Sequence, residues 1–292
     1  MEEYFLPEEK LAEQFPKLSN FELIGRGGQK QVYKCDYGKK KLALKFIQVE
    51  NEVMFDDTAL DRVHREIKLI NNLKSPYLVK VGLVAPGYFK KDNSLFYYYS
   101  EEYLDGPTVR EMICTQVFDN NLCLKMLINI TSAIEALWTG GRESVHRDIK
   151  PENIIYKKSD DIFVLIDAGM VLIKQETSLT PTGYVVGTLP YMSPEQISGR
   201  RNLLDYRSDL YALGLVAYEC ITGKHAYITA GMKKSEIINN IINFVPPILK
   251  GKVEHYSEEL LDVVDILVKK RPHMRFNSCK KLLEKLAIIS YN

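Results

Sequence analysis

Residues 145–153, which read VHRDIKPEN, constrain this chain more than any other stretch of its 292 residues. Their charges and proline argue against a helix, so a loop is expected to hold the polar side chains. In such a loop the Asp148 carboxylate can accept a hydroxyl proton, the Asn153 amide oxygen can bind a metal, and Lys150 can neutralise a transferring phosphoryl group. A solvated loop without function is the weaker interpretation, because nine such residues in this order are improbable by chance.

A second carboxylate lies at a spacing that fits the same chemistry. Asp167 comes fourteen residues after Asn153, at the end of the apolar stretch 162–166, and Gly169 follows it closely. A carboxylate at the end of a buried strand suits a Mg²⁺ ligand that bridges phosphates. An isolated D-A-G sequence is most often a turn, so the metal interpretation depends on the spacing from Asp148 and Asn153.

A glycine-rich segment, residues 25–32 (GRGGQKQV), is predicted between two strands. Gly25, Gly27 and Gly28 let backbone N–H groups approach phosphates without an intervening Cβ atom. Taken alone the motif is weak, because glycines in hairpins usually only form turns. A dinucleotide-binding motif is disfavoured, because that motif opens a helix and the residues after Val32 continue as a strand.

Lys45 lies among apolar neighbours on the third predicted strand, in the sequence LALK. A lysine in such a place is normally an exposed edge residue. Glu66 gives the position more weight, because it lies in the middle of a helix predicted over 57–74 and can reach back to Lys45. An ion pair of this kind would aim the lysine at α- and β-phosphate oxygens.

Hydrophobic periodicity divides the chain into a strand-rich and a helical part. Residues 21–103 fit a five-stranded sheet with one helix, and its last two strands are expected at 78–83 and 95–102. From residue 120 onward the pattern turns helical, with an amphipathic helix over 122–138 and a buried helix over 209–221.

A hinge between the two parts is expected at about 103–107, where a strand runs into Asp-Gly-Pro. Residues 1–20 form an N-terminal extension with apolar residues such as Leu6, Leu11 and Phe15. These side chains can pack on the strand-rich part or dock a partner, and packing is the expected use.

Taken together, the motifs resemble the protein kinases of the Ser/Thr type, and most of all their bacterial members. The resemblance runs from about Phe21 to Leu286 and implies a bilobal α+β fold, with a β-rich small lobe at 21–103 and a helical large lobe at 104–292. It implies transfer of the γ-phosphate of ATP to serine or threonine of protein substrates, with Mg²⁺, or Mn²⁺ as its substitute.

The resemblance also implies a role for each residue of the site. The catalytic residues would be Asp148, Lys150, Lys45 and Glu66, and the metal ligands would be Asn153 and Asp167. The nucleotide-binding residues would be Gly25, Gly27, Gly28, Val32, Ala43, Lys45, Glu102, Leu104 and Ile155. The residues of the activation segment and its supports would be Arg147, Gly169, Thr188, Glu195, Asp209 and Arg275. In these sets Asp209 braces the catalytic loop, and Arg275 pairs with Glu195.

Three positions depart from the family pattern. Lys30 replaces the third glycine of the glycine-rich loop, and Ala168 stands where phenylalanine is usual. Glu101 falls at the back of the adenine pocket, where an apolar or small polar residue is usual. These departures motivate an alternative, a pseudokinase or nucleotide-binding scaffold with little or no turnover.

The retained phosphate, metal and acceptor contacts favour an active enzyme over that alternative. A small-molecule phosphotransferase on the same fold is a weaker alternative, because such relatives generally lack the complete run at 145–153 and the Ser-Pro-Glu sequence at 193–195. Tyrosine as a minor acceptor stays open, because acceptor choice depends on fine geometry.

A hydroxyl-rich loop at 175–184 suggests regulation by phosphorylation. The plain interpretation is a solvated loop, but Arg147, just before the catalytic aspartate, is a natural seat for a phosphate on this loop. Thr180 and Thr182 resemble the paired threonines that bacterial relatives autophosphorylate. We therefore expect a phosphoprotein, with a transient dimer during autophosphorylation.

Charge and cysteine content exclude several other classes. The 39 basic and 38 acidic residues give a net charge of +1, so no global field gathers nucleic acid or an anionic membrane, and neither is expected as a partner. The five scattered cysteines favour reduced thiols over a disulfide framework. No secretory signal is visible, and no apolar run approaches the roughly 20 residues of a membrane helix. The expected location is the cytoplasm.

Overall fold

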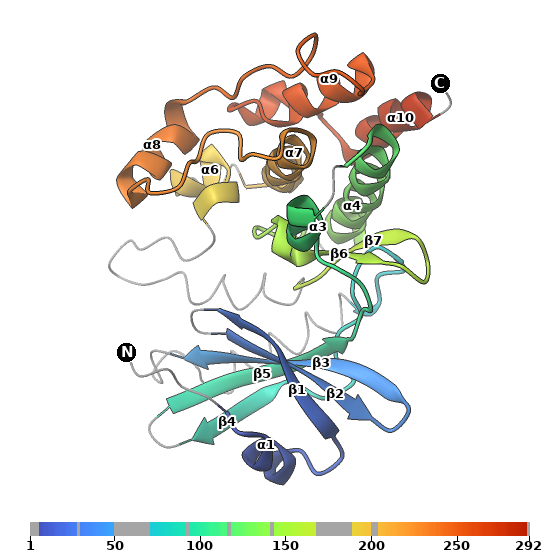
Figure 1. The fold of residues 1–292 in the computed structure, drawn as a ribbon, viewed down its shortest axis with the longest axis vertical. Helices are drawn as coiled ribbons and strands as arrows, with labels where there is room; N and C mark the ends of the chain where they lie inside the picture. Colours follow the sequence, from blue (N-terminus) through green and yellow to red (C-terminus); the bar gives the residue numbers. More distant parts are fainter. Residues whose placement is uncertain are drawn as a thin grey trace. The chain divides into compact units, whose positions relative to one another are not determined.

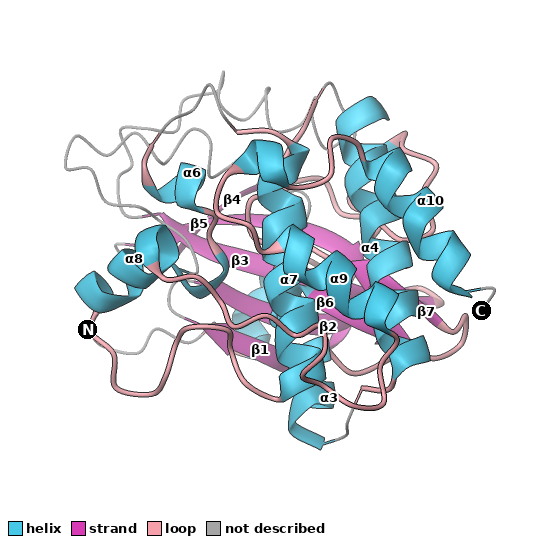
Figure 2. Cartoon of the chain, turned by 90° about the horizontal axis from the view of Figure 1, so that it is seen from above, coloured by secondary structure: helices cyan, strands magenta, loops and turns pink. Residues whose placement is uncertain are grey.

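The computed structural model of the chain describes residues 6–27, 30–49, 71–91, 94–115, 118–140, 143–167, 189–199 and 204–290. The chain forms two compact units. The first comprises Met1–Asn71 and Lys80–Leu104, and the second comprises Asn72–Val79 and Asp105–Asn292. The first unit is rich in strands and the second in helices, as the α+β class predicts (Figure 2).

The first unit is built on a five-stranded antiparallel sheet in the order β1-β2-β3-β5-β4 (Figure 1). Its strands are β1 (Ser19–Gly27), β2 (Lys30–Tyr37), β3 (Lys40–Val49), β4 (Gly87–Lys91) and β5 (Ser94–Glu102). The tip of the β1–β2 hairpin and the helix expected at 57–74, up to residue 70, lie outside the described residues.

The prediction of a strand at 78–83 is wrong. Only isolated bridges occur there, from Leu78 to Leu165 and from Val81 to Glu101. The hairpin partner of β5 is instead β4, which pairs with it in antiparallel register from Gly87 to Lys91. Pairing β5 with β4 closes a shorter loop than pairing it with residues 78–83 would, and a shorter loop costs less conformational entropy. This outweighs the alternation of apolar and polar residues at 78–83.

Residues 6–20 of the N-terminal extension pack on one face of this sheet, so the expected packing is confirmed for this described part. Leu11 of the helix α1 (Glu8–Gln14) belongs to the same buried cluster as the apolar residues of β3, and Leu6 and Leu11 are both completely buried. The Leu6 backbone is also tied to β2, since its N–H donates to Gln31 Oε1 at 3.3 Å and its carbonyl accepts from the Tyr33 hydroxyl at 2.8 Å. The extension is therefore part of the core of the first unit.

The second unit is built around α7 (Tyr206–Thr222), whose residues are buried on every side, as expected for 209–221. Asp205 caps its N-terminus by accepting the Arg207 N–H at 2.8 Å, and Gly223 ends it with a φ of 69°. The other helices are α3 (Val109–Thr115), α4 (Asn120–Gly140), α6 (Pro194–Ile197), α8 (Lys234–Asn243), α9 (Glu258–Leu267) and α10 (Cys279–Ser290). A two-stranded sheet, β6 (Ile154–Lys157) and β7 (Ile162–Leu165), completes the unit.

The helix α4 corrects one expectation from the sequence. With 21 residues it is long and apolar enough to cross a membrane by length and composition. Its apolar residues instead lie in the core, where Met126, Leu127 and Ile130 are completely buried, and it packs on α7 and α10 (Figure 1). These are the properties of a core helix.

All five cysteines are free thiols, and four of them are buried. The prediction of reduced cysteines is therefore confirmed. Burial raises the pKa of Cys35, Cys123 and Cys279 to about 12, which keeps these thiols protonated.

Candidate functional site

The backbone of the loop at 145–153 is held by hydrogen bonds to the buried carboxylate of Asp209 on α7. Its Oδ2 atom accepts the His146 N–H at 2.7 Å, and its Oδ1 atom accepts the Arg147 N–H at 2.8 Å. Burial raises the pKa of Asp209 to about 7, while the two backbone donors act in the opposite direction. Two strong bonds to successive amides hold the backbone of Arg147 in its left-handed conformation, with a φ of 64°.

Two polar side chains, those of Lys150 and Asn153, converge at Asp148, the expected catalytic base. Lys150 Nζ lies 3.3 Å from Asp148 Oδ2. Asn153 Nδ2 donates to the Asp148 carbonyl at 2.8 Å and to its Oδ2 atom at 3.2 Å. A short 3₁₀ turn, η2 (Pro151–Asn153), brings these positions together. The arrangement holds one carboxylate between a cation and an amide, as an acid–base group beside a phosphoryl site requires.

Asp167 follows β7, and the residue before it is bonded to the catalytic loop. The Ile166 N–H donates to the Asn153 carbonyl at 2.9 Å, and the Ile166 carbonyl accepts from His146 Nε2 at 3.0 Å. Asp167 is buried and has a φ of 65°. A non-glycine residue in this conformation is unusual and typical of functional sites.

The donor set of Asn153 and Asp167 fits a Mg²⁺ ion. Because the Asn153 amide nitrogen donates to Asp148, its Oδ1 atom is the one that can bind a cation. One carboxylate and one amide oxygen suit Mg²⁺, which takes most of its other ligands from phosphates and water. Within the described part of the chain no group of three or more His, Cys, Asp or Glu residues could hold a metal on its own.

The segment Ser193-Pro194-Glu195 begins α6 and is bound to the catalytic loop through Gln196. Gln196 Oε1 accepts the Ser193 N–H at 2.9 Å and forms a capping box with it. The same side chain donates through Nε2 to the Arg147 carbonyl at 3.0 Å. One glutamine thus joins the start of α6 to the residue before Asp148.

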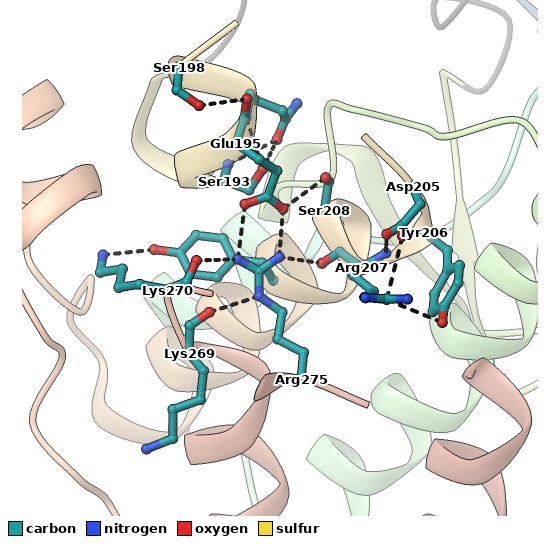
Figure 3. A network of polar contacts seen from close by, with 12 residues as sticks. Ser193, Glu195, Ser198, Asp205, Tyr206, Arg207, Ser208, Lys269, Lys270 and Arg275 are labelled. Atoms are coloured by element: carbon teal, nitrogen blue, oxygen red, sulfur yellow. Dashed lines mark hydrogen bonds and ion pairs between the residues drawn. The ribbon is translucent and has the colours of Figure 1, made fainter. Parts of the chain in front are cut away.

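Glu195 and Arg275, the pair that the family resemblance implies, lie together in the core of the second unit (Figure 3). The guanidinium contacts the carboxylate at two points, with distances of 2.6 Å and 3.1 Å. Its remaining N–H groups donate to the backbone carbonyls of Lys269, Arg207 and Lys270 at 2.8–3.0 Å. Every donor of the buried arginine is therefore paired, which is what makes a buried ion pair tolerable.

A second arginine network, which sequence reasoning missed, lies on α3. Arg110 donates to Glu152 at 2.8 Å, to Glu219 at 2.6 Å and to the Tyr191 hydroxyl at 2.6 Å. Tyr191 also hydrogen-bonds Glu219. The guanidinium therefore joins α3, the catalytic loop, α7 and the short turn η3 (Leu189–Tyr191).

His225 supports the same turn from the other side. Its Nε2 atom donates to the Pro190 carbonyl at 3.1 Å, and its ring contacts those of Tyr191 and Tyr227. Burial lowers the pKa of His225 to about 4, so the imidazole is neutral at pH 7.

In the first unit, the expected phosphate-binding lysine lies on the sheet face opposite α1. Lys45 is opposite Val32 on one side and Tyr99 on the other. It forms a buried ion pair with Glu101, a partner that the sequence did not indicate. Ala43, which lies on the same face of β3 and is expected at the adenine, is also buried.

The remaining expected nucleotide contacts belong to both units. Gly25 and Gly27 lie on β1, and the N–H of Glu102 is already bonded to the Lys80 carbonyl at 2.9 Å. Leu104 ends the first unit, and Ile155 lies on β6 of the second. The adenine site expected from these residues stays a prediction.

Several expected site residues lie outside the described part of the chain. They are Gly28, Glu66, Ala168, Gly169, Thr180, Thr182 and Thr188. The expected pairing of Lys45 with Glu66 and the expected phosphosites therefore stay predictions.

Comparison with known proteins shows which family and which relatives the sequence resembles. Residues 18–286 match the protein kinase domain family. The chain is 31% identical over 77% of its length to the probable serine/threonine-protein kinase PknB of Lactococcus lactis. It is 30% identical over 70% of its length to the serine/threonine-protein kinase PknH of Mycobacterium bovis. It is 31% identical over 70% of its length to the serine/threonine-protein kinase PknE of Mycobacterium tuberculosis.

These matches cover only part of each relative. The aligned region is 35% of the Lactococcus protein and 33% and 34% of the two mycobacterial proteins. The chain thus corresponds to about a third of the length of the curated relatives it matches.

Proposed function

The chain belongs to the protein kinase family, and we propose that it transfers the γ-phosphate of ATP to serine and threonine hydroxyls of protein substrates. The observation that carries this proposal is the catalytic loop. The side chains of Lys150 and Asn153 both lie within hydrogen-bonding distance of Asp148, and Asp209 fixes the backbone of the loop. The serine/threonine specificity of the named bacterial relatives supports the choice of acceptor.

In the proposed transfer each of these side chains would have its own task. The acceptor oxygen forms a bond to the γ-phosphorus while the bond from that phosphorus to the bridging oxygen of ADP breaks, and Asp148 takes up the hydroxyl proton. Lys150, which contacts Asp148, neutralises charge on the moving phosphoryl group. Asn153 and Asp167 would hold Mg²⁺, which when bound neutralises charge on the phosphate oxygens.

Regulation by the loop at 175–184 is a further part of the proposal. Phosphate on Thr180 or Thr182 would be held by Arg147, whose backbone is bonded to both Asp209 and Gln196. Two copies would meet transiently when one phosphorylates the other. The cytoplasmic location, and the absence of nucleic acid and membrane among the partners, stay predictions from the sequence.

The test is incubation of the purified chain with Mg²⁺ and labelled ATP, followed by mapping of phosphosites by mass spectrometry. Loss of the base in Asp148→Asn should reduce incorporation by roughly 10²–10⁴-fold. Phosphate on Thr180 or Thr182 in the wild type, and its absence in the variant, would support both the activity and the regulation. No phosphate on the chain or on a generic acceptor protein would defeat the proposal in favour of a nucleotide-binding scaffold.

A further inference from the structure

The sheet of the first unit has two different faces. The face that α1 covers is apolar and contains Leu42, Leu44 and Phe46, all completely buried. Residues on the other face alternate with these along each strand. On that second face, β3 contributes Lys45 and β5 contributes Glu101.

The strand register fixes the separation of these two residues. Lys45 is directly opposite Tyr99, and Glu101 is directly opposite Ala43. The two charged residues are therefore diagonal neighbours on adjacent antiparallel strands, within reach of long side chains. The ladder between β3 and β5 is continuous from Leu42 to Val49, so the backbone itself brings the carboxylate to the ammonium.

Water has almost no access to this pair. The Lys45 side chain is 3% exposed and the Glu101 side chain is 1% exposed. A buried ammonium is costly unless it is paired, and the same is true of a buried carboxylate. The Tyr99 ring adds a weaker contact, with its centroid 5.7 Å from Lys45 Nζ. Glu101 thus provides a full opposite charge to the lysine that is expected to hold the nucleotide phosphates.

We propose that Glu101 is a positioning residue, which keeps the Lys45 ammonium charged and aimed for nucleotide phosphate. The inference rests on the proposed function in taking Lys45 as a phosphate ligand. It also accounts for a residue that departs from the family pattern, because a buried carboxylate is costly unless its charge is paired. Because both partners belong to one sheet, their pairing does not require any helix to be in a particular position.

A double-mutant cycle on nucleotide binding tests the proposal in the full chain. The affinity for Mg²⁺·ATP is measured by calorimetry for wild type, Glu101→Gln, Lys45→Met and the double variant. Glutamine keeps the shape but removes the charge, so affinity should fall about tenfold in the protein that retains Lys45. In the Lys45→Met background the same change should alter affinity by less than roughly twofold, because Glu101 acts through Lys45.

A matched control comes from the same sheet. Lys34 and Glu22 form an ion pair across β1 and β2 at 2.7 Å, but Glu22 is 62% exposed. Glu22→Gln should therefore leave the affinity within about twofold of wild type. Glu101→Asp keeps the charge on a shorter side chain and should recover most of the lost affinity. It also serves as the second test variant if Glu101→Gln folds poorly.

Unchanged or tighter binding by Glu101→Gln would overturn the proposal, and so would an equal loss in both Lys45 backgrounds. The binding assay needs no turnover, so it separates this inference from the proposed function. If Glu101→Gln weakens nucleotide binding only in the presence of Lys45, but the wild-type chain transfers no phosphate, the kinase proposal is defeated and the role of Glu101 stands. Phosphate transfer with normal nucleotide binding by Glu101→Gln would defeat only the role of Glu101.

Discussion

At the scale of single residues, the site depends on two unusual backbone conformations. Arg147 and Asp167 have φ values of 64° and 65°, which cost a non-glycine residue of order 1 kcal/mol each. The cost at Arg147 is offset by the two backbone bonds to Asp209. At Asp167 it is offset by the bonds of the preceding residue, Ile166, to the catalytic loop. Hydrogen bonds within the second unit thus hold both residues in their left-handed conformations.

His225 gives a prediction about pH at the same scale. Burial lowers its pKa from 6.5 to about 4, so the unfolded chain binds a proton between these values and the folded chain does not. The stability that neutral His225 contributes is therefore present above about pH 6.5 and is lost as the pH falls toward 4. Between pH 7.5 and 5.5 we expect a loss of about 1 kcal/mol in the free energy of unfolding.

Urea unfolding of wild type and His225→Gln at the two pH values measures this loss. Glutamine retains a donor for the Pro190 carbonyl but does not titrate, so the pH dependence of the variant should be smaller by that amount. The raised pKa of Asp209 gives a pH dependence of the free energy of unfolding with the opposite sign. Both proteins contain Asp209, so its contribution cancels when their pH dependences are subtracted. The exposed His273→Gln is the control. Equal pH dependence of wild type and His225→Gln would contradict the assignment.

At the scale of elements, the sequence predicts best what is encoded in contiguous residues. The helices α4 and α7 were predictable because their buried residues recur at helical spacing within one segment. The loop at 145–153 was recognisable for the same reason, since its polar residues are neighbours in sequence. The strand β4 was misplaced because its identity depends on which segment pairs with β5, and local pattern does not decide this.

Contacts between distant residues could not be predicted in this way. The partners of Arg110 lie 42, 81 and 109 residues along the chain, and an isolated arginine on a short helix gives no signal of them. Glu101 is 56 residues from Lys45, and only the register of β3 against β5 shows that they meet. Glu195 and Arg275 were paired through family resemblance and not through their spacing.

The Arg110 network leads to a prediction about α3. Arg110→Lys keeps the positive charge but cannot contact Glu152, Glu219 and Tyr191 at once, because an ammonium lacks the planar fork of a guanidinium. We expect a loss of about 1–2 kcal/mol in the free energy of unfolding, measured by urea denaturation. The expected loss is modest because the Arg110 side chain is 32% exposed, so water screens part of its interactions.

Arg207→Lys is the matched control for this change. Arg207 lies at the start of α7 and has a single carboxylate partner, Asp205, at 3.4 Å. Its replacement should cost less than about 0.5 kcal/mol. Similar losses in the two variants would mean that the multiple contacts of Arg110 add no stability.

At the scale of the whole molecule, the two units have separate cores. The core of the first includes α1 and the covered face of its sheet, with Leu6, Leu11 and Phe46 completely buried. The core of the second surrounds α7, and Leu282 of α10 is completely buried in it. The single tryptophan, Trp138, lies in the second unit against Tyr206, with 5.2 Å between ring centroids. Its fluorescence is therefore a probe of the second unit.

This organisation predicts that the two units can be destabilised separately. Leu11→Ala removes a buried side chain from the first unit and should cost that unit about 2–5 kcal/mol. Hydrogen exchange followed by mass spectrometry should show at least about tenfold faster exchange in β1, β2 and β3, with the protection of α4 and α7 unchanged. The midpoint of Trp138 fluorescence in urea should also stay at its wild-type value.

Leu282→Ala provides the reciprocal measurement, because it should accelerate exchange in α4 and α10 and leave the sheet of the first unit protected. If either variant accelerated exchange equally in both units, the chain would be unfolding as one cooperative body. Selective effects in both directions would show that α1, although it lies in an extension before the first strand, stabilises the sheet that positions Lys45 and Glu101. Loss of α1 would then weaken nucleotide binding through the sheet, without any change in the catalytic loop.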